Sequence, residues 1–382
     1  MNILFIVPGF GLGGTTTALA SLLNCGLADV YDIDVFAISR RCYNLQPVVS
    51  HDIGLNGLTT AYYGDFSCFH TKDKLKYLFI KLLKQKQGGS FKLEEWIARK
   101  SIKKIERKKK YDVVIGFQEG LATRFSSHFS CSRKIAWIHC DYANTYGEEM
   151  DELNLYNCFE KVVCVSQFTR QGFVGRYPAL AEKTVAIHNI FDAESVIERS
   201  KATIDDTRFD TSRFTIISLG RVHGVKRFYL IPEIAVQLKE AGLDFRWYIL
   251  GSAGIPSELQ RLMDAIQRNG MEGNVIYLGG KANPYPYLKA ANLLVSISKS
   301  EACPMIFNEA KILHVPIVSA DFGSAFEFIE DGKTGIISPL SDIPNAIMQW
   351  CSDKELRYRI NKNINNFEFN NTDLIATVES IL

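Results

Sequence analysis

The 382-residue sequence lacks the features that mark several classes of protein. Its nine cysteines form no C-x-x-C pair, which argues against a zinc site and against a disulfide framework. No apolar run reaches the roughly 18–20 residues that a membrane-spanning helix requires. The chain leads directly into a short apolar stretch at positions 3–7, without the basic lead of a signal peptide. We therefore expect a cytoplasmic protein with reduced cysteines.

A strong overall charge is also missing, since the formal net charge is +2, but the basic residues are placed unevenly. Residues 71–110 hold 15 lysines and arginines against four acidic residues. Leu75, Leu78 and Leu82 recur there at helical spacing, which is typical of a basic amphipathic helix on an anionic membrane surface. Two ordinary helices with solvated lysines would have the same pattern. No nucleic-acid-reading motif accompanies the charge, so we expect no nucleic-acid partner.

Short apolar runs alternate with helical patterns through the first half of the chain. Each run has the length and composition of a strand buried inside a parallel sheet. This alternation predicts an α/β fold with a doubly wound parallel sheet. The predicted strands are residues 2–7, 34–38, 111–117, 134–141, 161–166 and 186–189.

A glycine-rich turn at residues 8–14 follows the first predicted strand and precedes a helix. Such a turn brings backbone amides close to a phosphate or a sugar. Gly9, Gly11 and Gly14 also match the G-x-G-x-x-G spacing of dinucleotide-binding proteins, with Asp32 or Asp34 as the acidic residue about 20 positions on. An NAD(P)-dependent oxidoreductase that uses the Gly9-to-Gly14 loop is therefore one hypothesis.

The second half repeats the alternation after a polar stretch at residues 193–213, where we place the boundary between two domains. Charged residues follow two of its predicted strands. Arg221 and Lys226 come after the strand at 214–218, and such a pair of cations can clamp a diphosphate. Glu301 and Glu309 come after the strand at 293–297, where carboxylates can accept the vicinal hydroxyls of a sugar or ribose. In isolation, two such glutamates are more often solvated helix charges.

Together these elements resemble the retaining, nucleotide-sugar-dependent glycosyltransferases of family 4, which have the B-type glycosyltransferase fold. Gly220 and Arg221 with Lys226 are similar to the family's G-R-x4-K element. The stretch from Glu301 to Glu309 is similar to its E-x7-E element, and residues 317–323 resemble the strand and glycine loop that follow.

The resemblance implies two facing Rossmann-like domains with the active site in the cleft between them. An acceptor-binding domain is expected over residues 1–195 and a linker over 196–213. A domain that binds the nucleotide sugar is expected over 214–360, and a last helix over 361–382 is expected to cross back to the first domain.

The resemblance also implies roles for single residues. Arg221 and Lys226 would hold the donor's diphosphate and offset the charge of the leaving group. Glu309 would accept the ribose hydroxyls, Glu301 would face the transferred sugar, and His139 would reach that sugar from the first domain. Further donor contacts are expected at Gly14, Gly251, Lys281, Cys303, Met305 and Ile306.

The implied function is a retaining, hexosyltransferase-type enzyme that moves a sugar from a UDP- or GDP-sugar to a lipid-linked or other glycan acceptor. Such an enzyme would serve surface polysaccharide or glycolipid biosynthesis at the inner leaflet of the cell membrane, with residues 71–110 on the membrane surface. Pro304 stands where many relatives have glycine and lacks an N–H, so the sugar is not implied. No metal or other cofactor is expected, because the two cations neutralise the phosphates. A non-catalytic module that binds sugar nucleotides is a further alternative.

Overall fold

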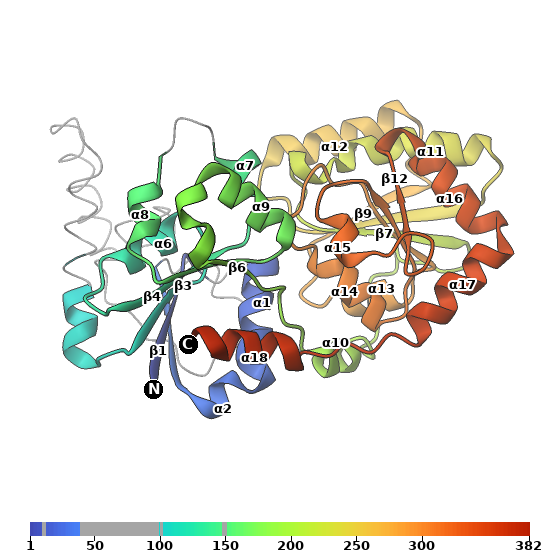
Figure 1. Cartoon of the computed structure of the whole chain (residues 1–382). Helices are drawn as coiled ribbons and strands as arrows, with labels where there is room; N and C mark the ends of the chain where they lie inside the picture. The colour runs from blue at the N-terminus through green and yellow to red at the C-terminus, as the bar shows by residue number, and fades with distance from the viewer. Residues whose placement is uncertain (10–12, 39–98, 100–101, 147–150) are drawn as a thin grey trace, which may run out of the picture. The chain divides into compact units, whose positions relative to one another are not determined.

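The computed structural model describes residues 1–9, 13–38, 99, 102–146 and 151–382 (Figure 1). It divides into two compact units. The first unit combines Met1–Ile190 with Thr372–Leu382, and the second consists of Phe191–Asn371. Each unit has its own sheet of six parallel strands, which confirms the predicted α/β fold with two Rossmann-like domains.

The sheet of the first unit has the strand order β2-β1-β3-β4-β5-β6. Its central strands are apolar on both faces, as expected for a parallel sheet that helices cover on both sides. In β1, for example, four consecutive residues from Ile3 to Ile6 are fully buried. The strands are β1 Asn2–Val7, β2 Asp32–Ala37, β3 Val113–Gly116, β4 Arg133–Ile138, β5 Lys161–Cys164 and β6 Thr184–Ala186.

Helices pack on this sheet through apolar side chains, and many of those that pack on β4 and β5 are aromatic. Tyr142, Tyr156 and Phe173 form an aromatic cluster beside β4 and β5. Ser166 caps the helix that follows β5, because its hydroxyl accepts the Thr169 N–H at 3.0 Å. The helices are α1 Gly14–Leu22, a π-helical turn at Leu23–Leu27, α2 Ala28–Val30, α6 Leu121–Ser127, α7 Tyr142–Thr145, α8 Leu153–Asn157, α9 Gln167–Arg176, η3 Pro178–Lys183 and α18 Thr372–Ile381.

The sheet of the second unit has the order β12-β11-β10-β7-β8-β9. The chain builds outward from β7 to β9, then returns to the other side of β7 with β10 and builds outward again. The direction therefore reverses between β7 and β10, and open α/β sheets bind ligands at such a point, beyond the carboxyl ends of the strands. The strands are β7 Phe214–Leu219, β8 Phe245–Leu250, β9 Val275–Gly279, β10 Leu293–Ser296, β11 Ile317–Ala320 and β12 Ile336–Ser338.

One large apolar cluster forms much of the core of the second unit. Trp247 and Ile216 of its sheet are fully buried against Leu238 and Leu262 from the helices. The helices are α10 Ala193–Arg199, η4 Gly224–Lys226, η5 Phe228–Leu230, α11 Ile231–Glu240, α12 Pro256–Arg268, α13 Tyr285–Lys289, α14 Met305–Ile312, α15 Ala325–Phe328, η6 Leu340–Asp342, α16 Ile343–Ser352 and α17 Lys354–Asn365.

The boundaries of the units differ from the predicted ones. The expected linker at 196–213 lies within the second unit, and its first residues belong to α10. Asp192 caps that helix by accepting the Ser195 N–H at 2.9 Å. The polar composition of this stretch reflects side chains that bond to the unit rather than a free linker.

The C-terminal residues are divided between the two units. The predicted single helix at 361–382 is the end of α17 in the second unit and, separately, α18 in the first. The ends of the second unit are tied together, because the side chain of Asn371 bonds to both the N–H and the carbonyl of Phe191 at 3.2 and 2.7 Å. The chain therefore leaves and re-enters the first unit at adjacent points.

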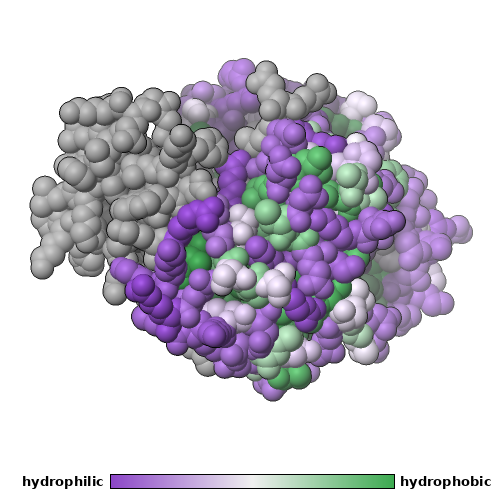
Figure 2. Space-filling model, turned by 60° about the vertical axis from the view of Figure 1, so that its left-hand side comes forward, coloured by the Kyte–Doolittle hydropathy of each residue, from purple (hydrophilic) through white to green (hydrophobic). Residues whose placement is uncertain are grey.

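Most of the basic segment 71–110 lies outside the described residues. Its described part is helical at 102–108, with Ile102 and Ile105 buried, so this part packs as an ordinary core helix. Within the part of the chain that the structure covers, no helix is long and apolar enough to cross a membrane. The face shown in Figure 2 is mostly hydrophilic, and its hydrophobic residues form small groups.

Candidate functional site

The loops after β7 and β10 bring two predicted site residues together. These strands are parallel neighbours, so both loops leave the same edge of the sheet at the point where the strand order reverses. Lys226 in the first loop forms an ion pair with Glu301 in the second. The backbone joins the loops as well, because the Lys299 N–H donates to the Val225 carbonyl at 2.8 Å.

Glu301 is held at both its side chain and its backbone. Its Oε1 atom accepts a hydrogen bond from the Ser298 hydroxyl at 2.7 Å, and its carbonyl accepts one from the Ser324 hydroxyl at 2.7 Å. The side chains of Lys226 and Glu301 are 22% and 17% exposed. The pair is thus oriented and partly shielded from water, which strengthens its electrostatic field, yet solvent still reaches it.

Two glycines allow the loops at this edge to pack closely. A Cβ atom on Gly220 would lie 2.8 Å from Cε of Lys226, so the lysine side chain passes over the glycine. A Cβ atom on Gly251 would overlap the carbonyl oxygen of Gly220. Gly251, predicted as a donor contact, therefore lies where the loop after β8 packs against the backbone of the loop after β7. Arg221 follows Gly220 directly, and its side chain is exposed.

Glu309, the second predicted carboxylate, lies in α14 in a very different environment. It is only 8% exposed, and the Tyr285 hydroxyl from α13 donates to its Oε1 atom at 3.0 Å. Burial raises the pKa of Glu309 from 4.5 to about 7, although the Tyr285 hydrogen bond and the charge of Arg199 act in the opposite direction. Sequence reasoning did not identify Tyr285 or Arg199 as part of the site.

Of the predicted donor contacts near Glu301, Met305 and Ile306 lie at the start of α14, and Cys303 lies just before this helix. Pro304 precedes the helix with a φ of −70° and cannot donate a hydrogen bond. The amides of Met305 and Ile306 belong to the first helical turn, where N–H groups have no acceptor within the helix and carry a positive partial charge. The loop can therefore offer N–H groups to a polar ligand.

Lys281 follows β9, and its side chain is engaged within the unit. Its Nζ atom lies 2.8 Å from Asp206, which also pairs with Arg208 at 2.6 Å. Hydrogen bonds from Arg208 and Lys281 hold the pKa of Asp206 well below its usual range. The lysine thus anchors the segment at 205–208 to the end of β9, and its side chain already has a partner within the unit.

In the first unit, His139 lies directly after β4, which ends at Ile138 and not at residue 141 as predicted. Its Nε2 atom is buried and has no hydrogen-bond partner among the residues that the structure describes. Burial lowers the pKa of the ring to about 3, so the imidazole is neutral at physiological pH. Its backbone N–H donates to the carboxylate of Glu119 at 2.7 Å. Sequence reasoning missed Glu119, although an acidic residue shortly after a buried strand was the signal for it.

The glycine-rich turn of the first unit lies only partly within the described residues. Gly14 begins α1, but residues 10–12 lie outside the described part. Asp32 and Asp34 occupy the first half of β2, and Lys109 pairs with each of them at 2.8 Å. A ribose-binding acid should lie at the carboxyl end of this strand. The geometry therefore does not support the nicotinamide hypothesis.

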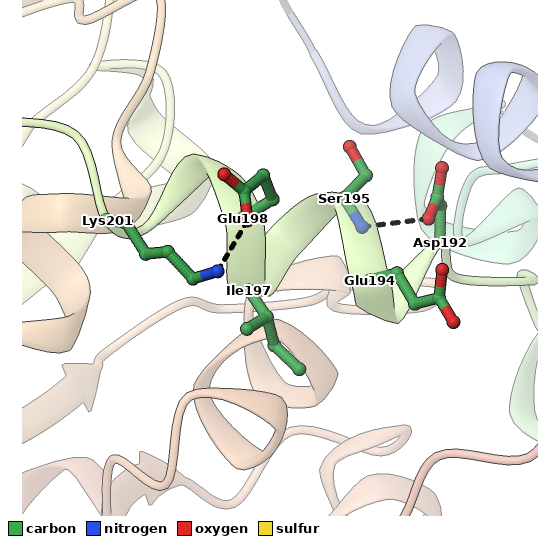
Figure 3. A pocket seen from close by; sticks show the side chains of 6 residues that line it. All are labelled: Asp192, Glu194, Ser195, Ile197, Glu198 and Lys201. Atoms are coloured by element: carbon green, nitrogen blue, oxygen red, sulfur yellow. Dashed lines mark hydrogen bonds and ion pairs between the residues drawn. The ribbon is translucent and has the colours of Figure 1, made fainter.

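A pocket of about 540 Å³ lies along α10 and the turn that follows it (Figure 3). Glu198 pairs with Lys201 at 2.5 Å, and Asp192 caps the helix. Both carboxylates therefore have partners within this segment. The pocket includes no predicted site residue and is lined by Asp192, Glu194, Ser195, Ile197, Glu198 and Lys201.

Comparison with protein families identifies the second unit. Residues 200–367 match the family model described as glycosyl transferases group 1. An uncharacterized glycosyltransferase of Methanocaldococcus jannaschii is 22% identical over 196 residues, which cover 49% of this chain and 48% of the relative. An alpha-D-kanosaminyltransferase of Streptomyces kanamyceticus is 26% identical over 153 residues, 39% of each chain.

The lipopolysaccharide core biosynthesis glycosyltransferase LpsE of Rhizobium meliloti is 25% identical over 162 residues, 41% of this chain and 46% of the relative. The chain thus spans less than half the length of these curated relatives.

Solved structures resemble this chain over its whole length. HepE of Anabaena in complex with UDP-glucose has a TM-score of 0.76 at 18% identity and covers 100% of both chains. Sucrose-phosphate synthase from Thermosynechococcus elongatus has a TM-score of 0.72 at 16% identity and covers 100% of this chain and 98% of its own. These likenesses confirm the predicted B-type glycosyltransferase fold with two α/β domains.

Proposed function

Because residues 200–367 belong to the group 1 glycosyl transferases, we propose that this protein transfers a sugar from a nucleoside-diphosphate sugar to a glycan or lipid-linked acceptor. The proposal is carried by one observation, the pairing of Lys226 with Glu301 where the strand order of the second sheet reverses. At that point, a cation that can bind a diphosphate lies beside a carboxylate that can accept hydrogen bonds from sugar hydroxyls.

In this proposal Arg221 and Lys226 bind the donor's diphosphate. Negative charge builds on that group as the glycosidic bond breaks, and preorganised cations stabilise it. The exposed guanidinium of Arg221 is suited to planar, bidentate contact with phosphate oxygens, and Lys226 acts as a point charge. Glu301, which the ion pair and Ser298 hold in place, faces the transferred sugar.

The remaining donor contacts come from α14 and its approach. Glu309 accepts the ribose hydroxyls, and the amides of Cys303, Met305 and Ile306 donate to the donor. His139 contacts the sugar from the first unit, and its unpartnered, neutral imidazole supports that role. Gly14 and the backbones at Gly251 and Lys281 complete the proposed donor site.

We propose a retaining, hexosyltransferase-type reaction in which the leaving phosphate helps to deprotonate the acceptor on the same face of the sugar. Arg221 and Lys226 provide the neutralising charge, so no metal or other cofactor is required. The UDP-glucose in the HepE structure favours a uridine donor over a guanosine donor. The likeness to LpsE favours surface polysaccharide biosynthesis, which would take place at the inner leaflet of the cell membrane.

A thermal-stability panel with UDP, GDP, ADP, CDP and NADH tests the proposal. A ligand that binds only the folded state at 100 times its dissociation constant adds about 2.7 kcal/mol to stability. We expect a shift with one nucleoside diphosphate, and we expect Arg221→Ala to abolish it. Lys239→Ala, which removes an exposed lysine from α11, should leave the shift unchanged. A shift with NADH alone would overturn the proposal.

Turnover separates an enzyme from a binding module. We expect the matching nucleoside-diphosphate sugar to be consumed when a glycan acceptor is present. Nucleotide binding with no consumption of the donor, across a series of lipid-linked and free glycan acceptors, would instead indicate a non-catalytic sugar-nucleotide module.

A further inference from the structure

We propose that Tyr285 is a positioning residue that holds Glu309 ready for the ribose of the donor, and that Arg199 holds Tyr285 in place. This inference rests on the proposed function, in which Glu309 accepts the ribose hydroxyls. It adds two residues from α10 and α13 that do not themselves contact the transferred sugar.

The contact between Tyr285 and Glu309 joins α13 and α14, the helices that precede and follow β10 in the sequence. The tyrosine hydroxyl lies 3.0 Å from Oε1 of Glu309, and the two residues are only 4% and 8% exposed. A hydrogen bond to a buried carboxylate is stronger than one in water and fixes the direction of the acceptor. It restrains the rotation of the Glu309 carboxylate and leaves Oε2 to accept from a ligand.

Arg199 fixes the tyrosine from the other side. Its guanidinium carbon lies 4.6 Å from the centre of the Tyr285 ring, a cation–π contact. Its Nη2 atom donates to the Ala282 carbonyl at 3.1 Å, and the Asn283 side chain donates to the Arg199 carbonyl at 2.8 Å. The end of α10 is therefore bonded to the turn that begins α13.

These neighbours also favour the charged form of Glu309. Burial favours the neutral acid, whereas the hydrogen bond from Tyr285 and the positive charge of Arg199 favour the carboxylate. The charge of Asp192, at the start of α10, raises the pKa of Tyr285 and not that of Glu309. Lys311 of α14 is directed elsewhere, since its Nζ donates to the Phe328 carbonyl at 3.0 Å. A carboxylate accepts two vicinal hydroxyls, whereas a neutral acid accepts them weakly.

Two matched variants isolate the tyrosine hydroxyl. Tyr285→Phe removes it and keeps the ring on which Arg199 packs. Tyr287→Phe makes the same change on the same helix, at a residue that is also 4% exposed but whose hydroxyl lies 3.5 Å from Asp205 instead. Glu309→Gln removes the charge of the carboxylate itself.

The measurement is the affinity of each variant for UDP and 2′-deoxy-UDP, with GDP and 2′-deoxy-GDP in parallel. A hydrogen bond to a charged group contributes about 1.5–3 kcal/mol, so the wild type should prefer the ribonucleotide by about tenfold or more. We expect Tyr285→Phe to lose most of this preference and Tyr287→Phe to keep it. The pH at which UDP affinity reaches half of its maximum should also rise in Tyr285→Phe and in Arg199→Gln.

The outcomes separate this inference from the proposed function. If Glu309→Gln keeps the wild-type preference for the ribonucleotide, Glu309 does not bind the ribose and that part of the proposed function fails. If Glu309→Gln loses the preference while Tyr285→Phe keeps it, only the positioning inference is overturned. Equal weakening of both nucleotides in Tyr285→Phe, with the ratio unchanged, also overturns it, because a merely structural defect has that effect.

Discussion

Two glutamates that stand eight positions apart in one loop and helix have opposite environments. Glu301 pairs with Lys226 and accepts from Ser298, and solvent still reaches it. Glu309 is buried and accepts a hydrogen bond from Tyr285, on whose ring the Arg199 guanidinium packs. Burial and neighbouring charge determine how a carboxylate interacts with a ligand, so the two residues can bind different parts of the donor. At the scale of single residues, this difference leads to two predictions.

The first concerns the dependence of donor affinity on pH. The pKa of Glu309 is raised to about 7 in the free protein, and ribose hydroxyls should bind its charged form. Affinity should therefore increase as pH rises toward 7 and level off above it, with a proton released on binding below pH 7. Calorimetry of UDP binding in two buffers of different ionisation enthalpy measures that proton.

Glu309→Gln is the control, because it cannot titrate and should remove both the pH dependence and the proton release. The raised pKa of Glu309 also makes the free energy of unfolding depend on pH. Its contribution to folding is fully present below pH 4.5 and is lost as pH rises through 7. An affinity that does not change between pH 5.5 and 8 in the wild type would contradict the assignment.

The second prediction concerns the ion pair. Glu301→Ala and Lys226→Ala should each lower turnover by about 10²–10³, the loss typical when a preorganised electrostatic group is removed. Since the two side chains act as one unit, the double variant should lose much less than the product of the single losses. Glu330→Gln is the matched control, because Glu330 belongs to an exposed pair with Lys333 at 3.1 Å. Full turnover in both single variants would refute the site.

At the scale of elements, the loops beyond the carboxyl ends of β7, β8 and β9 support one another through their backbones. The Gly220 N–H donates to the Leu250 carbonyl at 3.0 Å, and the Gly251 N–H donates to the Gly279 carbonyl at 2.9 Å. The G-R-x4-K stretch is therefore not an independent loop. Its shape depends on a neighbouring turn about 30 residues further along the chain.

We expect Gly251→Ala to destabilise the second unit by about 3 kcal/mol, the upper end of ordinary single substitutions, because the new methyl group would overlap the Gly220 carbonyl. Gly254→Ala lies in the same turn and meets nothing within 4 Å, so it should be nearly neutral. Thermal unfolding with and without UDP compares the two. Equal stability of both variants would show that the turn adjusts freely.

At the scale of the whole molecule, the second unit is one continuous segment and the first is made of two. The last helix, α18, belongs to the first unit, although 181 residues of the other unit (191–371) precede it. Val378, Ile381 and Leu382 of this terminal segment are buried. Arg133 at the start of β4 also donates to the Ile381 carbonyl at 3.4 Å.

Val378→Ala should therefore destabilise the first unit by about 2 kcal/mol, the cost of losing buried methyl groups. UDP affinity should remain unchanged, because Arg221, Lys226 and Glu309, which are proposed to bind the diphosphate and the ribose, lie in the second unit. Glu379→Ala alters the next, exposed residue and should have no effect on either quantity. Hydrogen exchange resolves the two units, and faster exchange in the second unit of Val378→Ala would contradict this assignment.

The sequence by itself determined the elements and their kind. Buried strands and the helices between them depend on neighbours within a few positions, so the parallel sheets could be predicted. The spacing of Arg221, Lys226, Glu301 and Glu309 likewise predicted a resemblance to glycosyltransferases, because a motif preserves local geometry, and residues 200–367 match the family model of group 1 glycosyl transferases.

Tertiary structure alone decided which side chains meet. The pairing of Lys226 with Glu301 spans 75 positions, and the contact between Tyr285 and Glu309 joins two separate helices. It also paired the Lys281 side chain with Asp206, and it placed Asp34 in the first half of its strand, where it does not match the role of a ribose-binding acid. Burial and charge at a side chain are set by groups distant in the chain, so no local pattern could contain them.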